Sequence, residues 1–464
     1  MDSSFFVLVW ADKAFILIYL ILIWAYGIYG AKPKSDEDFI LGGRSLSLPA
    51  FISTLVATWY GGVLGVGEFC YRHGLSSWVV MGVPYYCSAA LFAVFLARKV
   101  RASSCLTIPE RLRNHYGERV ALFASGVIFI HTMPASKVLM LGILLQMIFG
   151  WPLSCAIIIG TFFSIIYIFV GGFKAVVKTD VLQFILMLLS FIIILPFAVL
   201  FSKETGISIL DLPGNFLSLR GDIPLGYALA WLVFALWTLI APSFHQRCSA
   251  LKDPRKLKLG IFIAILIWFI LDGLMTVTGL YAKLIFPDIN PLYSYLYLAN
   301  FLLPAVFKGA FMVGLLAFIM STVDSNFHII STTFGYDIVA TMAPDFFKKH
   351  RRFVFAVGLI VAAIIAIIIA TVMPSVIMIW YTIYSITLPV LFLPVIATYY
   401  GFLKLNPLNT LRVMSATAIV TLVWMIFGWL RGSVHQPEYL ISLEPVYIGL
   451  VFSSFFYLIK LLHK

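Results

Sequence analysis

Charged residues are scarce in this sequence. Only 11% of its 464 residues are charged, whereas 62% are hydrophobic and 16% are aromatic. A soluble domain of this size needs far more polar surface to remain in water. The composition therefore excludes an ordinary soluble protein and predicts an all-α integral membrane protein.

Several chemical motifs are absent as well. The sequence has no GxxxxGK[ST] phosphate loop, which argues against ATP-driven transport. It has no HExxH, no GxSxG and no paired GxGD aspartates, so we expect neither a membrane enzyme nor an organic cofactor. The five cysteines form no CxxC pair and are interpreted as small apolar packing residues. The N-terminus lacks a basic region and a cleavage site, so we expect the first hydrophobic stretch to remain in the mature protein.

Hydrophobic stretches long enough to cross a bilayer, which takes roughly 20 residues, fill most of the chain. The sequence predicts thirteen such helices, at about 12–30, 47–73, 75–97, 120–149, 151–171, 180–201, 223–244, 259–284, 300–341, 353–373, 375–400, 410–430 and 443–461. The ninth is long for one crossing and is expected to continue into a turn.

The basic residues are distributed unevenly between alternate loops. If the N-terminus lies outside, roughly three quarters of the 32 lysines and arginines fall on the cytoplasmic side. This bias predicts a multi-pass cell-membrane protein with its N-terminus outside and its C-terminus in the cytoplasm. It also explains the net charge of +12 without a nucleic-acid partner, because basic loops face an anionic leaflet.

The ninth hydrophobic stretch carries the richest group of polar residues. Ser321, Asp324 and Ser325 have the spacing i, i+3, i+4 and share one helix face. Two hydroxyls and a carboxylate offer the oxygen ligands that hard cations prefer. Hydroxyls that bond to their own helix carbonyls are the structural alternative, but that alternative leaves Asp324 unexplained.

Glycines interrupt the second stretch. Gly61, Gly62, Gly65 and Gly67 weaken the helix in mid-membrane. Broken helices at this depth line cavities, and their freed carbonyls can bind sodium. Close packing of helices through small residues is the alternative interpretation.

Two charged residues fall inside predicted helices. Lys137 and Asp272 are each expected to bind the solute or to neutralise each other or another partner. A third, Asp180, follows the glycine-rich turn at 171–172 and could be a carboxylate that the helix dipole favours. Trp59 and Trp237 could line a solute pocket, although aromatic residues in such helices are commonly packing residues.

Taken together, these stretches resemble the sodium:solute symporter family. Six segments carry the resemblance in the family's order, at 38–45, 171–183, 246–252, 286–288, 320–325 and 336–338. The resemblance implies ten core helices in two inverted five-helix repeats, the leucine-transporter fold. It divides the chain into an N-terminal helix and linker (1–46), a first repeat (47–201), an external loop (202–222), a second repeat (223–401) and two C-terminal helices (402–464).

The resemblance also implies where sodium binds. One ion would lie between the carbonyls of Ala57, Tyr60 and Phe318 and the hydroxyls of Ser321 and Thr322. Some members bind a second sodium, and the residues at the matching positions here are Asp180, Ser321, Asp324 and Ser325. Asp324 stands where some members carry serine, so the number of ions stays open.

The solute is not fixed by the resemblance. Trp237 falls where sugar-carrying members place an aromatic residue, and Lys137 is a further substrate candidate. Trp59 lies in a segment similar to that of choline-carrying members, but Ala241 replaces a tryptophan of their site. We therefore expect sodium-coupled symport of a sugar, amino acid, carboxylate or quaternary amine into the cell by alternating access, with no protein partner required. Proton coupling, or a transporter-like sensor or channel, remains the alternative.

Overall fold

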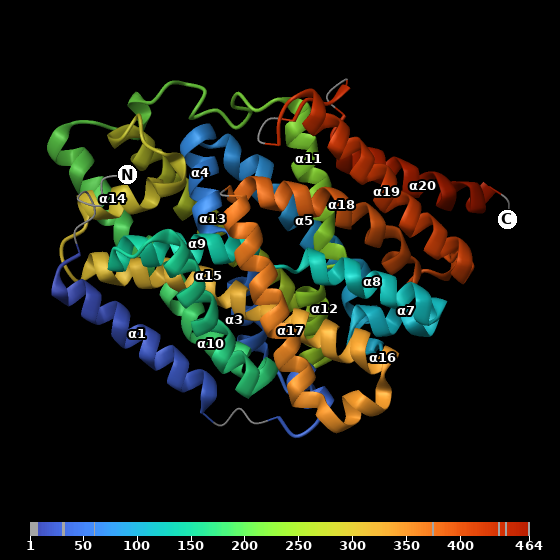
Figure 1. Cartoon of the computed structure of the whole chain (residues 1–464). Coiled ribbons are helices and arrows are strands. Elements are labelled where there is room, and N and C mark those ends of the chain that lie inside the picture. The colour runs from blue at the N-terminus through green and yellow to red at the C-terminus, as the bar shows by residue number, and fades with distance from the viewer. Residues whose placement is uncertain are drawn as a thin grey trace.

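The chain folds into one helical bundle, seen in a computed structural model that describes residues 8–29, 33–59, 61–373, 375–434, 437–440 and 443–462 (Figure 1). These described residues contain no β-strand, and their only β-like contact is an isolated bridge between Leu46 and Leu251. The all-helical class predicted from composition is confirmed.

The N-terminal half contains ten α-helices. They are α1 (Trp10–Ile28), α2 (Asp36–Leu41), α3 (Leu48–Trp59), α4 (Val63–His73), α5 (Val83–Leu91), α6 (Ala97–Ala102), α7 (Ile108–Tyr116), α8 (Glu118–His131), α9 (Ala135–Phe149) and α10 (Leu153–Thr205). Two π-helical turns, Trp78–Gly82 and Phe92–Leu96, join α5 and α6 into one long span.

The C-terminal half contains the other ten. They are α11 (Leu225–Ala235), α12 (Pro242–Ala250), α13 (Leu257–Ile285), α14 (Ser294–Leu302), α15 (Phe307–Thr332), α16 (Ala340–Met342), α17 (Pro344–Val372), α18 (Val376–Ala397), α19 (Pro407–Arg431) and α20 (Pro445–Leu462). A π-helical turn, Thr333–Val339, links α15 to α16.

The described residues give eleven or twelve candidate membrane spans, beside the thirteen predicted. Eleven helices in the described ranges are long and apolar enough to cross a bilayer, or twelve if the bent pair α3 and α4 is counted as one span. The predicted helices 151–171 and 180–201 both lie in α10, which bends at Gly172. The first part, 153–171, contains a shorter apolar helix, Leu153–Ile166, that is not among the eleven. The predicted count of thirteen is therefore not confirmed.

The predicted ninth helix, 300–341, begins too early. The chain leaves α14 at Leu302, and α15 starts only at Phe307. The carboxylate of Asp12, on α1, accepts hydrogen bonds from the backbone N–H groups of Val306 (2.8 Å) and Gly309 (3.0 Å). Because the first N–H groups of a helix lack intrahelical partners, Asp12 caps α15. A residue near the start of the chain thereby fixes where this helix begins.

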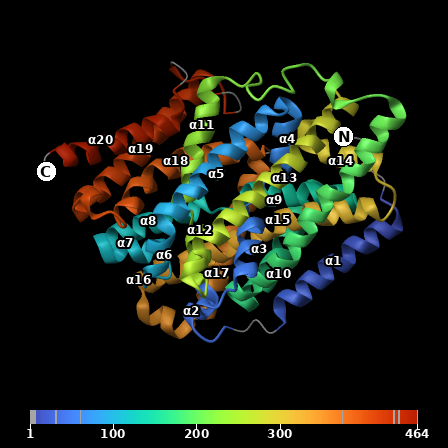
Figure 2. The same ribbon diagram turned by 180° about the vertical axis from the view of Figure 1, so that it is seen from behind.

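Helix α15 lies at the centre of the bundle. Almost all of its residues are buried, and it packs against α1, α3, α9, α10 and α17. By contrast, α1 runs along one flank and α19 and α20 along the opposite flank, as both views show (Figures 1 and 2). These flanking helices expose many large apolar side chains, including Ile18 and Val451. Such surfaces suit contact with lipid rather than water.

Gly172 positions the second half of α10. Its φ of +56° belongs to the region that favours glycine, and a Cβ atom there would come within 2.7 Å of the Phe39 ring. The bend lets the rest of α10 pack along α15. This packing brings Asp180 into the core, where it is fully buried.

Candidate sodium and solute site

A helix break lies beside the centre of α15. Helix α3 ends at Trp59 and α4 begins at Val63, with a 60° change of direction between them. A Cβ atom on Gly61 would lie 2.2 Å from the Thr322 side chain, and one on Gly62 would lie 2.2 Å from the Trp380 ring. Only glycine therefore allows this segment to approach α15 and α18 so closely. Tyr60, predicted to supply a sodium ligand, lies outside the described residues.

Two hydroxyls of α15 bond to the carbonyls at the end of α3. The Ser321 hydroxyl lies 2.7 Å from the carbonyl oxygen of Ala57 and 3.3 Å from that of Phe318. The Thr322 hydroxyl donates to the carbonyl of Thr58 at 2.8 Å. Oxygens that share one hard cation at ~2.4 Å stand roughly 3 Å apart. Three of the five predicted sodium ligands, Ala57, Phe318 and Ser321, thus lie close together. Thr322 bonds instead to the carbonyl of Thr58, the residue after Ala57.

A buried ion pair lies next to this contact. The guanidinium of Arg247 is 3.2 Å from a carboxylate oxygen of Asp180, and both side chains are fully buried. Arg247 also donates to the hydroxyls of Ser325 (2.7 Å) and Thr58. The Thr54 hydroxyl donates to the same Asp180 oxygen. Asp180 and Ser325, predicted parts of a second sodium site, therefore meet around a guanidinium.

Arg247 corrects the interpretation of the sequence. The predicted seventh helix ends at about 244, which puts Arg247 in the cytoplasmic loop that follows, but Arg247 lies inside α12 and is fully buried. Pro242, at the start of α12, was the available signal, because proline is common in the first turn of a helix. Asp324, the remaining predicted second-site residue, is buried on α15.

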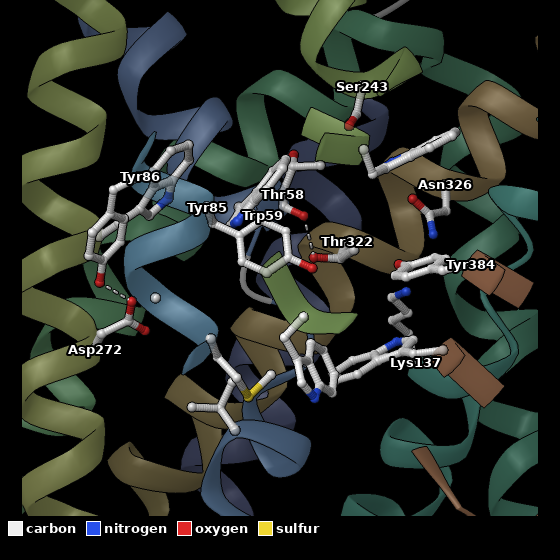
Figure 3. A pocket seen from close by; sticks show the side chains of 18 of the residues that line it. Thr58, Trp59, Tyr85, Tyr86, Lys137, Ser243, Asp272, Thr322, Asn326 and Tyr384 are labelled. Carbon is white, nitrogen blue, oxygen red and sulfur yellow. Dashed lines mark hydrogen bonds between the residues drawn. The ribbon is translucent and has the colours of Figure 1, made fainter. Parts of the chain in front are cut away.

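A cavity opens beside the helix break. All three predicted solute residues line it, namely Trp59, Lys137 and Trp237. Thr58 and Thr322 line it too, and the hydrogen bond between them is visible in Figure 3. The residues that hold α3 against α15 therefore form part of the cavity wall.

Aromatic side chains form much of the remaining wall. The Trp59 ring lies 5.4 Å from that of Trp268 and 5.5 Å from that of Tyr85. The ring of Trp237 stacks on that of His131, and both residues line the cavity. Sequence reasoning did not select Trp268 or Tyr85, because aromatic residues are abundant throughout this chain and nothing in their spacing distinguishes those that line a cavity.

Two charged residues, Lys137 and Asp272, line the cavity. Lys137 is 7% exposed, and its ammonium lies 5.6 Å from the centre of the Trp380 ring. No carboxylate in the described part of the chain comes within 4.0 Å of that ammonium. Asp272 instead accepts a hydrogen bond from the Tyr86 hydroxyl. The expectation that Lys137 and Asp272 neutralise each other directly is therefore wrong.

Comparison with known proteins decides the family. The sequence model of the sodium:solute symporter family matches residues 39–403. This chain belongs to the sodium:solute symporter family. The segments that suggested the resemblance fall inside or at the edge of the matched region.

Several relatives are transporters of small organic solutes. The chain is 24% identical to the high-affinity choline transporter 1 of Caenorhabditis elegans, covering 92% of this chain and 79% of that one. It is 24% identical to a sodium/pantothenate symporter of Haemophilus influenzae (80% and 81% covered) and 23% identical to the sodium/proline symporter 2 of Staphylococcus saprophyticus (96% and 92% covered). Family and relatives are transporters rather than enzymes, so this symporter-family member is a multi-pass membrane protein for sodium-coupled transport of a solute.

Solved structures establish the fold. A sodium-coupled sialic acid symporter in a substrate-bound outward-open state matches with a TM-score of 0.72 at 17% identity, covering 97% of this chain and 96% of that one. A nucleobase-cation-symport-1 family transporter in a closed conformation matches with a TM-score of 0.60 at 13% identity, covering 94% and 95%. The symporter-family chain therefore has the leucine-transporter fold.

Proposed function

We propose that this protein carries one small organic solute into the cell together with sodium, by alternating access. The observation that carries the proposal is the Ser321 hydroxyl, which lies at hydrogen-bond distance from the carbonyls of Ala57 and Phe318. A sodium ion at this point would join the broken helix to α15. The solute would bind in the adjacent cavity.

Residues that lie beside the proposed ion site and also line the cavity explain how sodium binding and solute binding would be coupled. Thr58 and Thr322 line the cavity, and their bond ties α3 to α15 one residue beyond the proposed ion site. An ion that draws α3 toward α15 would thus also shape the solute cavity. Each ligand would then bind better in the presence of the other, and the effect is reciprocal by thermodynamic linkage.

The membrane potential is sufficient to drive accumulation. One positive charge that crosses 100 mV releases about 2.3 kcal/mol. Because about 1.4 kcal/mol corresponds to a factor of ten, one sodium ion permits roughly fifty-fold accumulation. Inward transport of the solute needs no second energy source.

The buried side chains around Asp180, which are Arg247, Ser325 and Thr54, support transport of one sodium ion per cycle. Arg247 already supplies a positive charge between Asp180 and Ser325. A sodium ion placed among the same side chains would be repelled by the guanidinium, and this repulsion is strong where water is excluded. Binding of a second ion at Asp180, Ser321, Asp324 and Ser325 would require Arg247 to leave. We therefore assign transported sodium to the site at Ser321 and a structural ion pair to Asp180.

The orientation and the internal division follow the positive-inside bias and the family's pattern. We place the N-terminus outside and the C-terminus in the cytoplasm, with 47–201 and 223–401 as inverted repeats and 202–222 as an external loop. Cysteine substitutions at Ser208 and Lys404, both outside the long helices, test the orientation with a membrane-impermeant thiol reagent. Ser208 should be labelled in intact cells, and Lys404 only after the cells are opened. The reverse pattern would contradict this orientation.

Sodium binding is tested with purified full-length protein in detergent. Sodium chloride should raise the melting temperature relative to potassium chloride, because a ligand that binds the folded state stabilises it. The double variant S321A/T322A should lose this difference. The matched control is S331A, which also removes a buried hydroxyl of α15, one that donates to the Phe355 carbonyl at 3.0 Å, away from the proposed site.

The outcomes separate this proposal from its alternatives. A sodium effect that persists in the double variant would overturn the assignment of the site. Stabilisation or uptake that follows pH and ignores sodium would indicate proton coupling instead. Sodium-dependent solute binding without accumulation in proteoliposomes would indicate a sensor or a channel.

A further inference from the structure

We propose that the start of α17 binds the phosphate headgroups of anionic lipids at the membrane surface. The site is the basic segment 348–352, whose sequence is Lys-Lys-His-Arg-Arg, together with the exposed apolar side chains on either side of it. This inference goes beyond the proposed symport, because neither sodium nor the solute takes part in the binding.

The position of the basic segment along α17 puts it at the level of the lipid headgroups. Residues 353–372, which follow it, contain no charged residue and remain helical to the end of α17. At about 1.5 Å per residue this stretch is roughly 30 Å long, which matches the hydrocarbon core of a bilayer. A kink at His350 (φ −125°, ψ 31°) separates the stretch from the first turns of α17. In the proposed orientation, the basic segment thus lies at the cytoplasmic leaflet.

The basic segment carries positive charge that the protein itself does not neutralise. Lys349 and Arg352 are exposed, and neither has an ion pair or a hydrogen bond within the part of the chain that the structure describes. The ammonium of Lys348 lies 3.9 Å from a carboxylate oxygen of Asp345, but both side chains are largely exposed, and such surface pairs contribute little. Anionic headgroups would supply the missing negative charge.

The segment is held against the bundle. Phe347 is buried in an apolar cluster that contains Phe39 and Phe355. The guanidinium of Arg351 lies 3.0 Å from a carboxylate oxygen of Asp36, on α2. Figure 2 shows α16, which directly precedes α17, at the same end of the bundle as α2. A binding segment that is already in place loses less freedom when its ligand binds.

Exposed apolar side chains next to the basic segment favour a lipid over a free phosphate ion. Met342 is 71% exposed, Phe346 is 47% exposed and Phe353 is 61% exposed. Large apolar side chains beside basic ones are typical of segments that lie in a membrane interface, where the apolar groups contact acyl chains and the cations contact headgroups. A free phosphate ion would use only the cations. A lipid would use both kinds of side chain.

Three ligands test the proposal on purified full-length protein in detergent. They are dioctanoylphosphatidylglycerol, which is an anionic lipid, dioctanoylphosphatidylcholine, which carries no net charge, and potassium phosphate, which is a free anion. Each is titrated in potassium chloride while the melting temperature is measured, because a ligand that binds the folded state stabilises it. The anionic lipid should bind at least about tenfold more tightly than either of the other two, since it alone combines a net negative charge with acyl chains.

Paired variants locate the site. K349Q/R352Q should weaken binding of the anionic lipid roughly twentyfold, because each cation near an anionic surface contributes about fivefold in affinity. Its melting temperature without lipid should stay unchanged, since neither side chain has a protein partner in the described residues. The matched control is R255Q/K256Q, which removes one arginine and one lysine from another exposed basic stretch, where Arg255 is paired with Asp253 at 3.1 Å. That variant should bind the lipid as the wild type does.

A further variant separates the lipid from the free ion. F346S should weaken binding of the anionic lipid and leave phosphate binding unchanged, because only the lipid contacts the apolar side chains.

Several results would overturn the proposal. Equal stabilisation by the two lipids would show that the headgroup charge does not matter. Phosphate binding as tight as that of the anionic lipid would indicate a site for a soluble anion instead. Equal weakening by K349Q/R352Q and R255Q/K256Q would indicate a general effect of net charge rather than a site on α17. Because all titrations use potassium salts and no solute, their outcome is independent of sodium coupling.

Discussion

The hydroxyl of Ser321 lies 2.7 Å from the carbonyl oxygen of Ala57, although 264 positions separate the two residues. This contact joins the middle of a continuous helix, α15, to the end of an interrupted one, α3. It places the oxygen atoms of two distant segments at the spacing that a small cation requires.

The first prediction concerns the Ser321 hydroxyl alone. S321A should raise the sodium concentration needed for half-maximal solute uptake about tenfold, because one ligand of the ion is lost. Its effect on stability without sodium should match the ~1 kcal/mol of one buried hydrogen bond. S331A should show the same loss of stability with an unchanged sodium requirement. Equal sodium requirements in both variants would contradict the assignment.

The second prediction concerns the glycines of the helix break. G62A should abolish uptake or sharply reduce it, because the added Cβ atom would meet the Trp380 ring at 2.2 Å. The control is G126A in α8, where nothing lies within 4 Å of the new atom. That variant should keep full uptake and gain up to about 1 kcal/mol in stability, since alanine favours helix. Normal uptake by G62A would show that the break does not need this close approach.

The third prediction concerns the buried pair of Arg247 and Asp180. R247Q should lower the free energy of unfolding by about 3–5 kcal/mol, because it leaves the Asp180 carboxylate buried without its cation. The double variant R247Q/D180N should be more stable than R247Q alone, since neither charge remains. Melting temperatures in detergent measure both effects. Additive losses in the double variant would show that the two side chains do not act as a pair.

The number of sodium ions per cycle can be tested at the same pair. Sodium-dependent uptake by the wild type should follow a Hill slope of one. A slope of two, abolished by D180N, would instead place a second ion among Asp180, Ser321, Asp324 and Ser325.

The fourth prediction concerns the cap that α1 provides. D12A should cost about 0.5–2 kcal/mol, the usual range for a helix cap, because the N–H groups of Val306 and Gly309 lose their acceptor. D345A is the control, since Asp345 is exposed at the start of α17. Thermal melting distinguishes the two variants. An equal, small effect of both would show that α1 does not fix the start of α15.

Much of the fold could be predicted from local sequence. Long apolar stretches identify membrane helices because a lipid environment requires nearly continuous hydrophobicity, and Gly61 and Gly62 marked the break between α3 and α4. The boundaries of α15 could not be predicted, because its first turn depends on Asp12, nearly three hundred residues away in the sequence. The bend of α10 at Gly172 was marked in the sequence by the glycine-rich turn at 171–172, whereas its contact with Phe39 could not be predicted.

The site was predictable only in part. Ser321 stood out because it shares a helix face with Asp324 and Ser325 in an apolar segment, whereas Thr322 was implied only by the family resemblance. Arg247 was missed because an arginine near a predicted helix end is normally a loop residue, and only tertiary packing shows that Asp180 and Ser325 surround it. The placement of Lys137 and Asp272 on opposite sides of the cavity (Figure 3) could not be predicted from the sequence either, because it depends on how α9 and α13 pack in the bundle.

The most direct test of sodium coupling is a titration of solute affinity against sodium concentration, carried out with the wild type and with S321A. In the wild type, the solute dissociation constant should fall as sodium rises, with sodium affinity increasing equally when solute is present. In S321A the same curve should shift to higher sodium. A solute affinity that stays constant at all sodium concentrations would contradict coupling at this site.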